Sequence, residues 1–317
     1  MTADLVLAEG APGPTLVLHR DTVPPGRLAA RADLTAVTDW LARTGRGHIR
    51  KLALYGPPAD PTRHDLDYRF VQCLPDGFDF RAGCGHSLLA CVAAAGGTGP
   101  VRVRAVTTGD PVRCEPEPDG AYTVRLLRSA PFTGLLPTGR PLDRLCGVRA
   151  SLVHYGNPYV LVSAADLGVP TAAELHTAGD AVLARLRAIR AAAARLLGLR
   201  AGGALPKVAA VAPHGPGALA VRAVTVPSWH PGLALTGALC LAAAAAVPGT
   251  LPELLAGPAT GPRPAGRLLL RLVTPGGTVT ASAAADHGRL RDAGVHGKRV
   301  RVLERGLPVP WRIHVTA

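Results

Sequence analysis

The sequence predicts an α/β (α+β) protein of two pseudo-symmetric units, each a curved sheet around an Ala-rich helix. The first observation is a Gly-Cys-Gly turn at residues 83–85 that leads into an Ala-rich stretch ending at Gly96 and Gly97. Alanine and leucine favour a helix, and glycine favours its end. The second observation is a matching stretch at 236–250, in which Gly237 aligns with Gly85 and a Gly-Thr pair again follows the alanines. A repeat of this length predicts a duplicated unit.

The third observation is that flanking segments recur in the same order. A strand that starts with lysine precedes each Ala-rich helix, at 51–55 and 207–211. A strand pair follows each helix, at 101–107 with 112–115 and at 268–273 with 279–282. The repeat predicts domains at 1–146 and 147–317. It also places Cys84 and Thr236 at equivalent helix starts, facing one cleft.

The remaining elements follow from local patterns of apolar residues. In the first domain we expect strands at 15–18, 67–74 and 122–127, a helix at 32–44 and a turn at 24–26. In the second we expect strands at 151–155, 159–163, 220–226, 300–304 and 313–316, with a loop at 258–264. One long helix is expected at 172–199, open to a break near Gly179. Its arginines 185, 187, 190 and 195 are interpreted as a solvated face.

Composition limits the function classes. The chain has 317 residues and is 48% hydrophobic, enough for two packed cores. Neither a signal peptide nor a bilayer-spanning run is apparent, which predicts a cytoplasmic protein without a membrane partner. Six cysteines without regular spacing indicate reduced thiols and no zinc site. The net charge of +13 is scattered and aromatic residues are 4%, so no nucleic-acid partner is expected.

Lysine is rare in this chain. Of 35 basic residues only Lys51, Lys207 and Lys298 are lysines, and the first two hold matching places in the repeat. Lysine can lose its proton when desolvated, whereas arginine stays charged. A retained lysine therefore indicates proton chemistry, with chance retention as the alternative. Lys207 is either a site residue or a relic of the duplication. Asn157 is likewise the only asparagine.

Several motifs together carry a family resemblance. They are Asp-Leu-Asp-Tyr-Arg-Phe at 65–70, Leu-Pro-Thr-Gly at 136–139, Gly-Asn-Pro at 156–158, Leu-Pro-Lys at 205–207, and His230 followed by Thr-Gly-Ala at 236–238. From about Lys51 onward the chain resembles the PrpF-like family of 2-methylaconitate isomerases. That family shares the duplicated fold of diaminopimelate epimerase and proline racemase. The resemblance implies two epimerase-like domains, each a mostly antiparallel sheet or barrel around a central helix.

The resemblance also implies a reaction and a site. Such isomerases shift a double bond by 1,3-proton transfer in an unsaturated carboxylic or keto acid, with no cofactor and no metal. By position the catalytic residues would be Lys51 as base and Cys84 as proton donor or electrostatic partner. The implied substrate-binding residues are Gly85, His86, Ser87, Asn157, Lys207, His230, Thr236, Gly237 and Ala238. The partner would be a small unsaturated acid, and a homodimer stays open.

Three substrate-facing motifs depart from the family pattern. Cys-Gly-His stands at 84–86 in place of Cys-Gly-Asn, and Thr-Pro-Gly-Gly at 274–277 in place of His-Pro-Ser-Gly. The early Gly-Gly-Thr-Ser-Lys-Gly loop is not visible, and 19–24 reads His-Arg-Asp-Thr-Val-Pro. The substrate should therefore differ from 2-methylaconitate.

Some alternatives stay open at this level. The fold could serve a cyclase or epimerase of specialised metabolism, or a binding protein for small acids without catalysis. A racemase with two cysteines is disfavoured because Thr236 stands opposite Cys84. His86 could relay protons or cap the helix, and His230 could belong to the site or to the fold. Four further cysteines are interpreted as buried small residues: Cys91, Cys114, Cys146 and Cys240.

Overall fold

The computed structural model describes all residues except 22, 24–30, 76, 226, 258–265 and 312–317. The chain divides into two compact units. The first comprises Met1–Glu9, Gly13–Pro116 and Arg299–Ala317, and the second Gly10–Pro12 and Glu117–Lys298. These units interleave along the chain. They do not test where the duplicated sequence begins, so the domain limits 1–146 and 147–317 stay a prediction.

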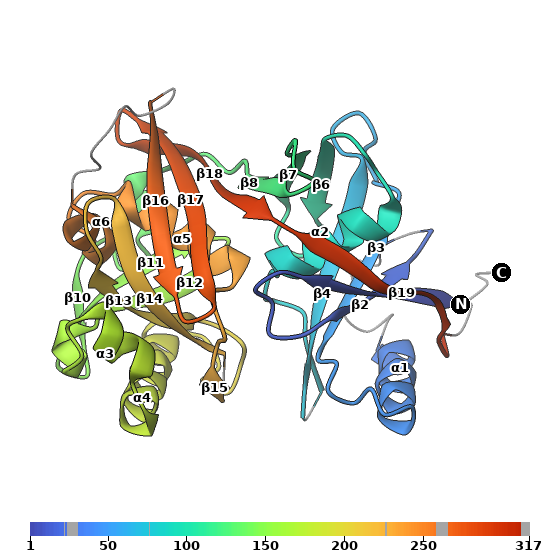
Figure 1. Cartoon of the computed structure of the whole chain (residues 1–317), viewed down its shortest axis with the longest axis horizontal. Coiled ribbons are helices and arrows are strands. Elements are labelled where there is room, and N and C mark those ends of the chain that lie inside the picture. Colours follow the sequence, from blue (N-terminus) through green and yellow to red (C-terminus); the bar gives the residue numbers. More distant parts are fainter. Residues whose placement is uncertain (22, 24–30, 76, 226, 258–265, 312–317) are drawn as a thin grey trace. The chain divides into compact units, whose positions relative to one another are not determined.

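In its described residues the first unit is a sheet with a helix on each face, α1 (Arg31–Arg43) and α2 (Gly85–Ala95) (Figure 1). Its strands are β1 (Thr2–Ala8), β2 (Thr15–His19), β3 (Lys51–Gly56), β4 (Leu66–Leu74), β5 (Gly77–Asp79), β6 (Val101–Ala105), β7 (Asp110–Pro116) and β19 (Val300–Pro308). The strand order is β19-β1-β2-β3-β4-β6-β7, with β5 paired to β4. The pairs β2–β3 and β4–β6 are parallel and the others are antiparallel.

The two helices of this unit pack against opposite faces of its sheet. Helix α1 (Arg31–Arg43) buries Leu34 and Leu41 in one core with Leu52 and Leu54 of β3. Successive side chains of a strand point to opposite faces. The alternate residues of β3 therefore face α2 (Gly85–Ala95), whose residues 85–92 are all buried. The helix ends at Gly96, which takes the left-handed conformation that glycine adopts without strain.

The second unit repeats this order. Its corresponding elements are β11 (Val148–Tyr155), β12 (Asn157–Ser163), α3 (Ala172–Thr177), α4 (Asp180–Leu196), β13 (Lys207–Pro213), β14 (Ala218–Thr225), β15 (Ser228–Trp229), α5 (Leu235–Ala245), β16 (Arg267–Thr274) and β17 (Gly277–Asp286). The pairs β12–β13 and β14–β16 are parallel, as are β2–β3 and β4–β6. The expected duplication and the mixed α/β fold, dominated by sheet, are confirmed.

Further elements complete the second unit. They are β8 (Tyr122–Leu126), β9 (Ala130–Pro131), the 3-10 helices η1 (Phe132–Leu135) and η2 (Ala165–Leu167), β10 (Asp143–Leu145), α6 (Leu251–Ala256) and β18 (Arg289–Lys298). Strand β8 follows β7 in the chain but pairs with β18, whereas β19 follows β18 and pairs with β1 of the first unit. The chain thus passes from one unit to the other at β8 and returns at β19.

Several local expectations need correction. Strand β1 and helix α6 were not expected, because both are short and carry weak periodicity. The break that the sequence left open near Gly179 is present, and it divides the long helix in two, since Gly179 adopts an extended conformation and caps α4. Arg190 is not solvated: it is 5% exposed, while the other three arginines of α4 are exposed. The expected turn at 24–26, the loop at 258–264 and the strand at 313–316 lie outside the described residues.

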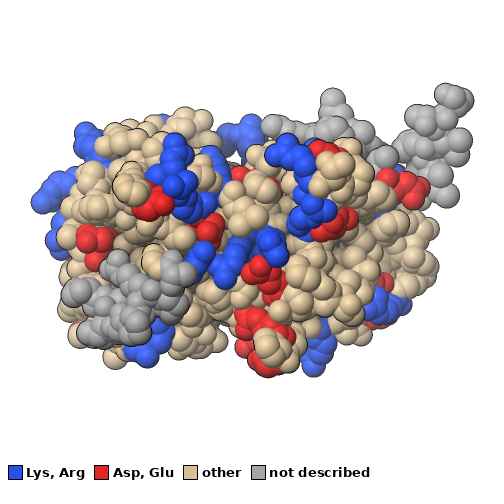
Figure 2. All heavy atoms as spheres, turned by 90° about the horizontal axis from the view of Figure 1, so that it is seen from above, with Lys and Arg blue, Asp and Glu red and all other residues tan. Residues whose placement is uncertain are grey.

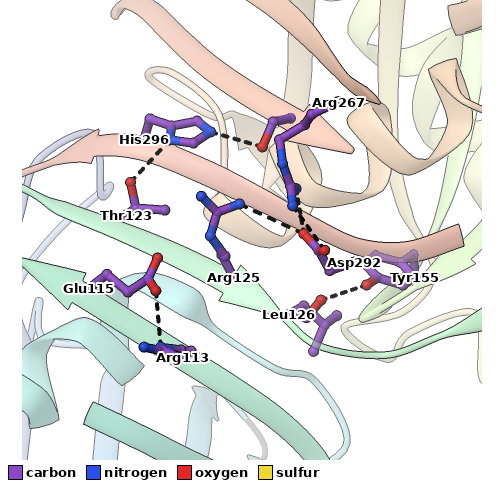
Figure 3. A network of polar contacts seen from close by, with 10 residues as sticks. Arg113, Glu115, Thr123, Arg125, Leu126, Tyr155, Arg267, Asp292 and His296 are labelled. Atoms are coloured by element: carbon purple, nitrogen blue, oxygen red, sulfur yellow. Dashed lines mark hydrogen bonds and ion pairs between the residues drawn. The ribbon is translucent and has the colours of Figure 1, made fainter. Parts of the chain in front are cut away.

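A polar network joins β8 to its neighbours in the second unit (Figure 3). Thr123 donates its hydroxyl hydrogen to Glu117 at 2.6 Å, so the His296 Nδ1–H donates to Thr123 at 3.0 Å. His296 Nε2 then accepts from the Ser282 hydroxyl at 2.8 Å. These bonds fix one tautomer of His296 and connect β8, β17 and β18.

The substitution His296→Ala should destabilise the second unit by about 2 kcal/mol, because it removes hydrogen bonds from two buried residues, Thr123 and Ser282. The thermal unfolding midpoint should fall by about 4–8 °C. His214→Ala is the matched control, since His214 is an exposed residue of the same unit. Equal midpoints for the two variants would contradict a stabilising role for the network.

Candidate functional site

Cys84 stands at the start of α2 with its backbone held in place. It is the N-cap residue, in an extended conformation. Its carbonyl oxygen accepts from the Leu88 N–H at 2.9 Å and from the Tyr68 hydroxyl at 2.8 Å. Burial raises the pKa of Tyr68 well above its usual value, with a smaller contribution from Cys84, so the phenol stays a hydrogen-bond donor. The Cys84 side chain remains partly exposed.

Two buried hydroxyl groups form a hydrogen-bonded row that ends at the Cys84 sulfur. Ser87 Oγ donates to Cys84 Sγ at 3.3 Å, and Thr15 Oγ1 lies 2.9 Å from Ser87 Oγ. Ser87 is fully buried and Thr15 is 2% exposed. A serine has one hydroxyl hydrogen, and Ser87 uses it on the sulfur. Thr15 is therefore the donor to Ser87, and the hydrogen bonds run in one direction toward Cys84.

Lys51 lies on the same face of the sheet as these groups. It is the first residue of β3 and is partly buried. The parallel register pairs Leu16 with Leu52, so Thr15 and Lys51 are neighbours one residue earlier on adjacent strands. Leu16 and Leu52 belong to the core shared with α1. Thr15 and Lys51 therefore point to the face that α2 covers, and the first unit brings Lys51 and Cys84 to one end of that face.

The other two residues predicted at this turn, Gly85 and His86, are the first two residues of α2. Gly85 is the first residue of α2, and His86 follows it with 2% exposure. Because His86 is buried, its side chain belongs to the packing of the first helical turn. The structure leaves its role in a proton relay as a prediction.

The second unit has a different helix start. Helix α5 begins at Leu235 with Ala234 as N-cap, so Thr236 lies inside the first turn and is not the cap. The N–H groups of Gly237 and Ala238 both donate to the Ala234 carbonyl, at 2.8 and 3.1 Å. Those two predicted binding residues use their amides within the helix, so a ligand at this turn would need other donors.

Asn157 supplies a polar group at this turn. Its side-chain amide donates to Thr236 Oγ1 at 3.2 Å, and both residues are buried. Tyr159 follows on the same face of β12 and pairs with Lys207 of β13 in parallel register. A Cβ atom at Gly237 would lie 2.7 Å from the Tyr159 hydroxyl, so glycine is needed for Tyr159 to pack against α5. The structure thus gathers Asn157, Lys207 and the start of α5.

His230 orders the turn that leads into α5. Its ring Nδ1 accepts from the Gly232 N–H at 3.1 Å, and its backbone N–H donates to the Ala223 carbonyl oxygen at 2.9 Å. The side chain is 5% exposed. These contacts give His230 a structural function at the site's border.

Register makes the two units directly comparable. Tyr159 pairs with Lys207 as Thr15 neighbours Lys51, so Thr15 and Tyr159 are equivalent. Thr15 and Tyr159 were missed by sequence reasoning because a strand register cannot be read from a single chain. The first unit carries a thiol with buried hydroxyls, whereas the second presents amide, phenol and hydroxyl groups.

Arg190 is a further residue that sequence reasoning misplaced. From α4 its guanidinium donates to the carbonyl oxygens of Ala201 and Pro206, both at 2.9 Å, and to that of Gly203. These carbonyls lie in the segment that leads directly into Lys207. Arg190 thus fixes the backbone that precedes β13.

The six cysteines differ in burial: four are buried, Cys84 is partly exposed and Cys146 is exposed. Burial raises the pKa of Cys73, Cys114 and Cys240 to about 12. Burial also raises the pKa of Cys91. Cys146 is exposed, contrary to expectation, because it occupies the tight turn between β10 and β11 with φ of 51°.

Brief treatment with iodoacetamide at pH 8 should label Cys84 and Cys146 and spare the other four cysteines. Only thiolates react, and buried thiols stay protonated at this pH. Peptide mapping by mass spectrometry measures each site, and Cys146 serves as the internal standard for a plain exposed thiol. Labelling of Cys240 or Cys91 as fast as Cys84 would contradict the packing around α5 or α2.

Charge on the surface is mixed in sign. On the face drawn in Figure 2, acidic side chains lie next to basic ones. Several arginines are ion-paired, among them Arg102 with Asp65 and Arg149 with Asp166, at 2.7 and 2.8 Å. The expectation that nucleic acid is not a partner stays a prediction.

Neither a metal-binding cluster nor a membrane-spanning helix is found among the described residues. No three His, Cys, Asp or Glu side chains among them lie close enough together to hold a metal ion. Within the same residues, every helix is too short or too polar to cross a membrane. The absence of metal and cofactor chemistry remains an expectation for experiment.

Known proteins resemble this chain in sequence and in fold. A family model described as PrpF protein matches residues 128–300. The 4-oxalomesaconate tautomerase of Pseudomonas putida is 26% identical over 333 residues, which cover 92% of this chain and 91% of that protein. The crystal structure of a methylitaconate-delta-isomerase has a TM-score of 0.67 at 20% identity and covers 98% of this chain and 95% of its own.

A racemase shares the fold more distantly. The crystal structure of a probable proline racemase from Agrobacterium radiobacter, with bound carbonate, has a TM-score of 0.62 at 16% identity. It covers 97% of this chain and 92% of its own. The fold is therefore that of the proline racemases and diaminopimelate epimerases, as the repeated sequence and its motifs predicted.

Proposed function

Since this chain belongs to the PrpF protein family, we propose that it is an isomerase that moves a carbon–carbon double bond by a 1,3-proton shift. Its similar proteins include a 4-oxalomesaconate tautomerase and a methylitaconate-delta-isomerase. The proposed substrate is an unsaturated di- or tricarboxylic acid or keto acid. Lys51 is the proposed base and Cys84 the proposed proton donor.

The observation that carries the proposal is the arrangement around the start of α2. A partly exposed thiol, a lysine on the adjoining strand face and the start of a buried helix all lie at one end of the first unit. Removing a proton from carbon requires that the resulting dienolate be stabilised, and a helix N-terminus favours negative charge. This arrangement therefore supports abstraction at one carbon and protonation at another.

The second unit supports a role in binding. Asn157 and Lys207 lie together there beside the first turn of α5, and side-chain amide and ammonium groups hold carboxylates. Thr236 takes the place of a second cysteine. A threonine hydroxyl is a poor proton acceptor, so this pairing disfavours racemisation by two thiols.

The test is an assay of the purified protein with 4-oxalomesaconate, methylitaconate and a panel of related unsaturated acids in deuterated water. We expect a shifted double bond in the proton NMR spectrum and deuterium at the newly protonated carbon. EDTA should leave the rate unchanged. Ligand-dependent thermal stabilisation without deuterium incorporation would instead indicate a binding protein, and inversion of proline or hydroxyproline would indicate an epimerase.

A further inference from the structure

The buried hydroxyls of Thr15 and Ser87 need an explanation beyond packing. Burying a hydroxyl costs free energy unless it is hydrogen-bonded. Here Thr15 donates to Ser87 and Ser87 donates to Cys84 Sγ, at 2.9 and 3.3 Å. Thr15 keeps its lone pairs as acceptors, and Lys51 is its neighbour on the next strand. An ordered row of exchangeable protons thus extends from beside Lys51 to the sulfur.

The second unit lacks this row, although its backbone is equivalent. Aligning Gly85 with Gly237 places Leu239 where Ser87 stands, and Tyr159 takes the place of Thr15. Thr236 bonds to Asn157 instead. The hydroxyl pair therefore occurs beside the thiol and is replaced where the thiol is replaced.

A proton shift in which one residue takes a proton and another gives one leaves both residues in the wrong protonation state. When Lys51 takes a proton from one carbon and Cys84 gives a proton to another, the product leaves behind a protonated amine and a thiolate. The next turnover requires the reverse state. The amine must therefore lose one proton and the sulfur must gain one after each cycle, either through water or through groups of the protein.

We propose that Thr15 and Ser87 form a proton relay that returns this proton from Lys51 to Cys84, an inference that rests on the proposed function. The amine gives a proton to Thr15 Oγ1, Thr15 passes its own hydrogen to Ser87, and Ser87 passes its own to the thiolate. Each hydroxyl loses one hydrogen and gains one, so both end unchanged. Thr15 and Ser87 are positioning residues that act through Cys84.

The sulfur end of the relay can be tested without substrate. Ser87→Ala removes the hydroxyl that donates to the sulfur. The rate of Cys84 alkylation by iodoacetamide at pH 8, followed by peptide mapping, should therefore fall about tenfold, the size of one hydrogen bond to a charged group. Thr15→Val should leave this rate nearly unchanged, because Ser87 still reaches the sulfur. An unchanged rate in Ser87→Ala would overturn the proposal.

The return step can be tested by stopped-flow assay with the substrate that the wild type turns over. Thr15→Val should give one burst of product per enzyme, followed by a steady rate ~100-fold below that of the wild type. The first turnover needs no return proton, so the burst should keep the normal rate. Thr15→Ser should restore steady turnover, because it restores the hydroxyl. Equal slowing of the first and later turnovers would overturn the relay.

A stability control separates these effects from packing. Ser151 is a fully buried serine of the second unit that donates to Pro141 at 2.6 Å. Ser151→Ala should lower the melting temperature as Ser87→Ala does, with neither a burst nor a slower alkylation of Cys84. If the wild type isomerises no acid, the proposed function fails, and the alkylation experiment still decides whether Ser87 acts on the sulfur.

Discussion

Lys51→Arg is expected to lower turnover about 100- to 10,000-fold while leaving substrate binding nearly intact. A general base contributes a factor of this size. Arginine keeps the positive charge that attracts a carboxylate, but it stays protonated and cannot accept a proton from carbon. Lys51→Ala should lose as much turnover and some affinity as well. The measurement is kcat and KM for the best acid of the panel, with deuterium exchange followed by NMR.

Lys298→Arg is the matched control, because it makes the same chemical change in β18, outside the candidate site. It should keep the wild-type rate. Retention of full activity in Lys51→Arg would remove Lys51 from the role of base and would leave Cys84 as the group to test next. Loss of activity in both variants would point to a general effect of lysine on folding, which melting curves would reveal.

The duplicated architecture was visible in the sequence because glycines and alanines mark the buried helices. Gly85 and Gly237 align and are followed by the same Gly-Thr signal, and a lysine opens the corresponding strand in each copy. The structure bears this out: the parallel pairs and the central helix recur in the same order in both units. Local composition was enough for these features since each depends on a short stretch of chain.

Features that depend on distant contacts were not visible. The unit that β8 or β19 joins depends on the strand with which it pairs, and the sequence of a single strand does not encode its partner. The position of Thr15 beside Lys51 depends on register. Arg190 sits on a helix with exposed arginines at 185, 187 and 195, and only the carbonyl groups it meets distinguish it from them.

On the proposed function, the two units divide the chemistry between them. Matching strand positions carry Lys51 and Lys207, whereas the aligned residues Cys84 and Thr236 differ in place: Cys84 caps α2, and Thr236 lies inside the first turn of α5. The first helix start is the one that favours negative charge beside a thiol. With a hydroxyl in place of the second thiol, the proposal leaves proton exchange to the first unit and binding to the second. This asymmetry fits a shift of a double bond better than inversion of a stereocentre.

Arg190→Met is expected to destabilise the protein by about 3 kcal/mol, which corresponds to a fall of about 6–12 °C in the melting temperature. Methionine retains much of the apolar stem but removes every bond to the carbonyls of Ala201, Gly203 and Pro206. Burial lowers the pKa of Arg190, yet an arginine remains charged at neutral pH, so the lost bonds are charge-assisted ones.

Arg187→Met is the control, because Arg187 lies on the exposed face of the same helix. Its effect should stay within about 0.5 kcal/mol. The segment that Arg190 holds leads into Lys207, so Arg190→Met should also raise KM more than it lowers kcat at temperatures where the variant is folded. Circular dichroism melts and steady-state kinetics measure the two effects. Equal melting temperatures for the two variants would show that the bonds of Arg190 add nothing to stability, and an unchanged KM would separate this segment from substrate binding.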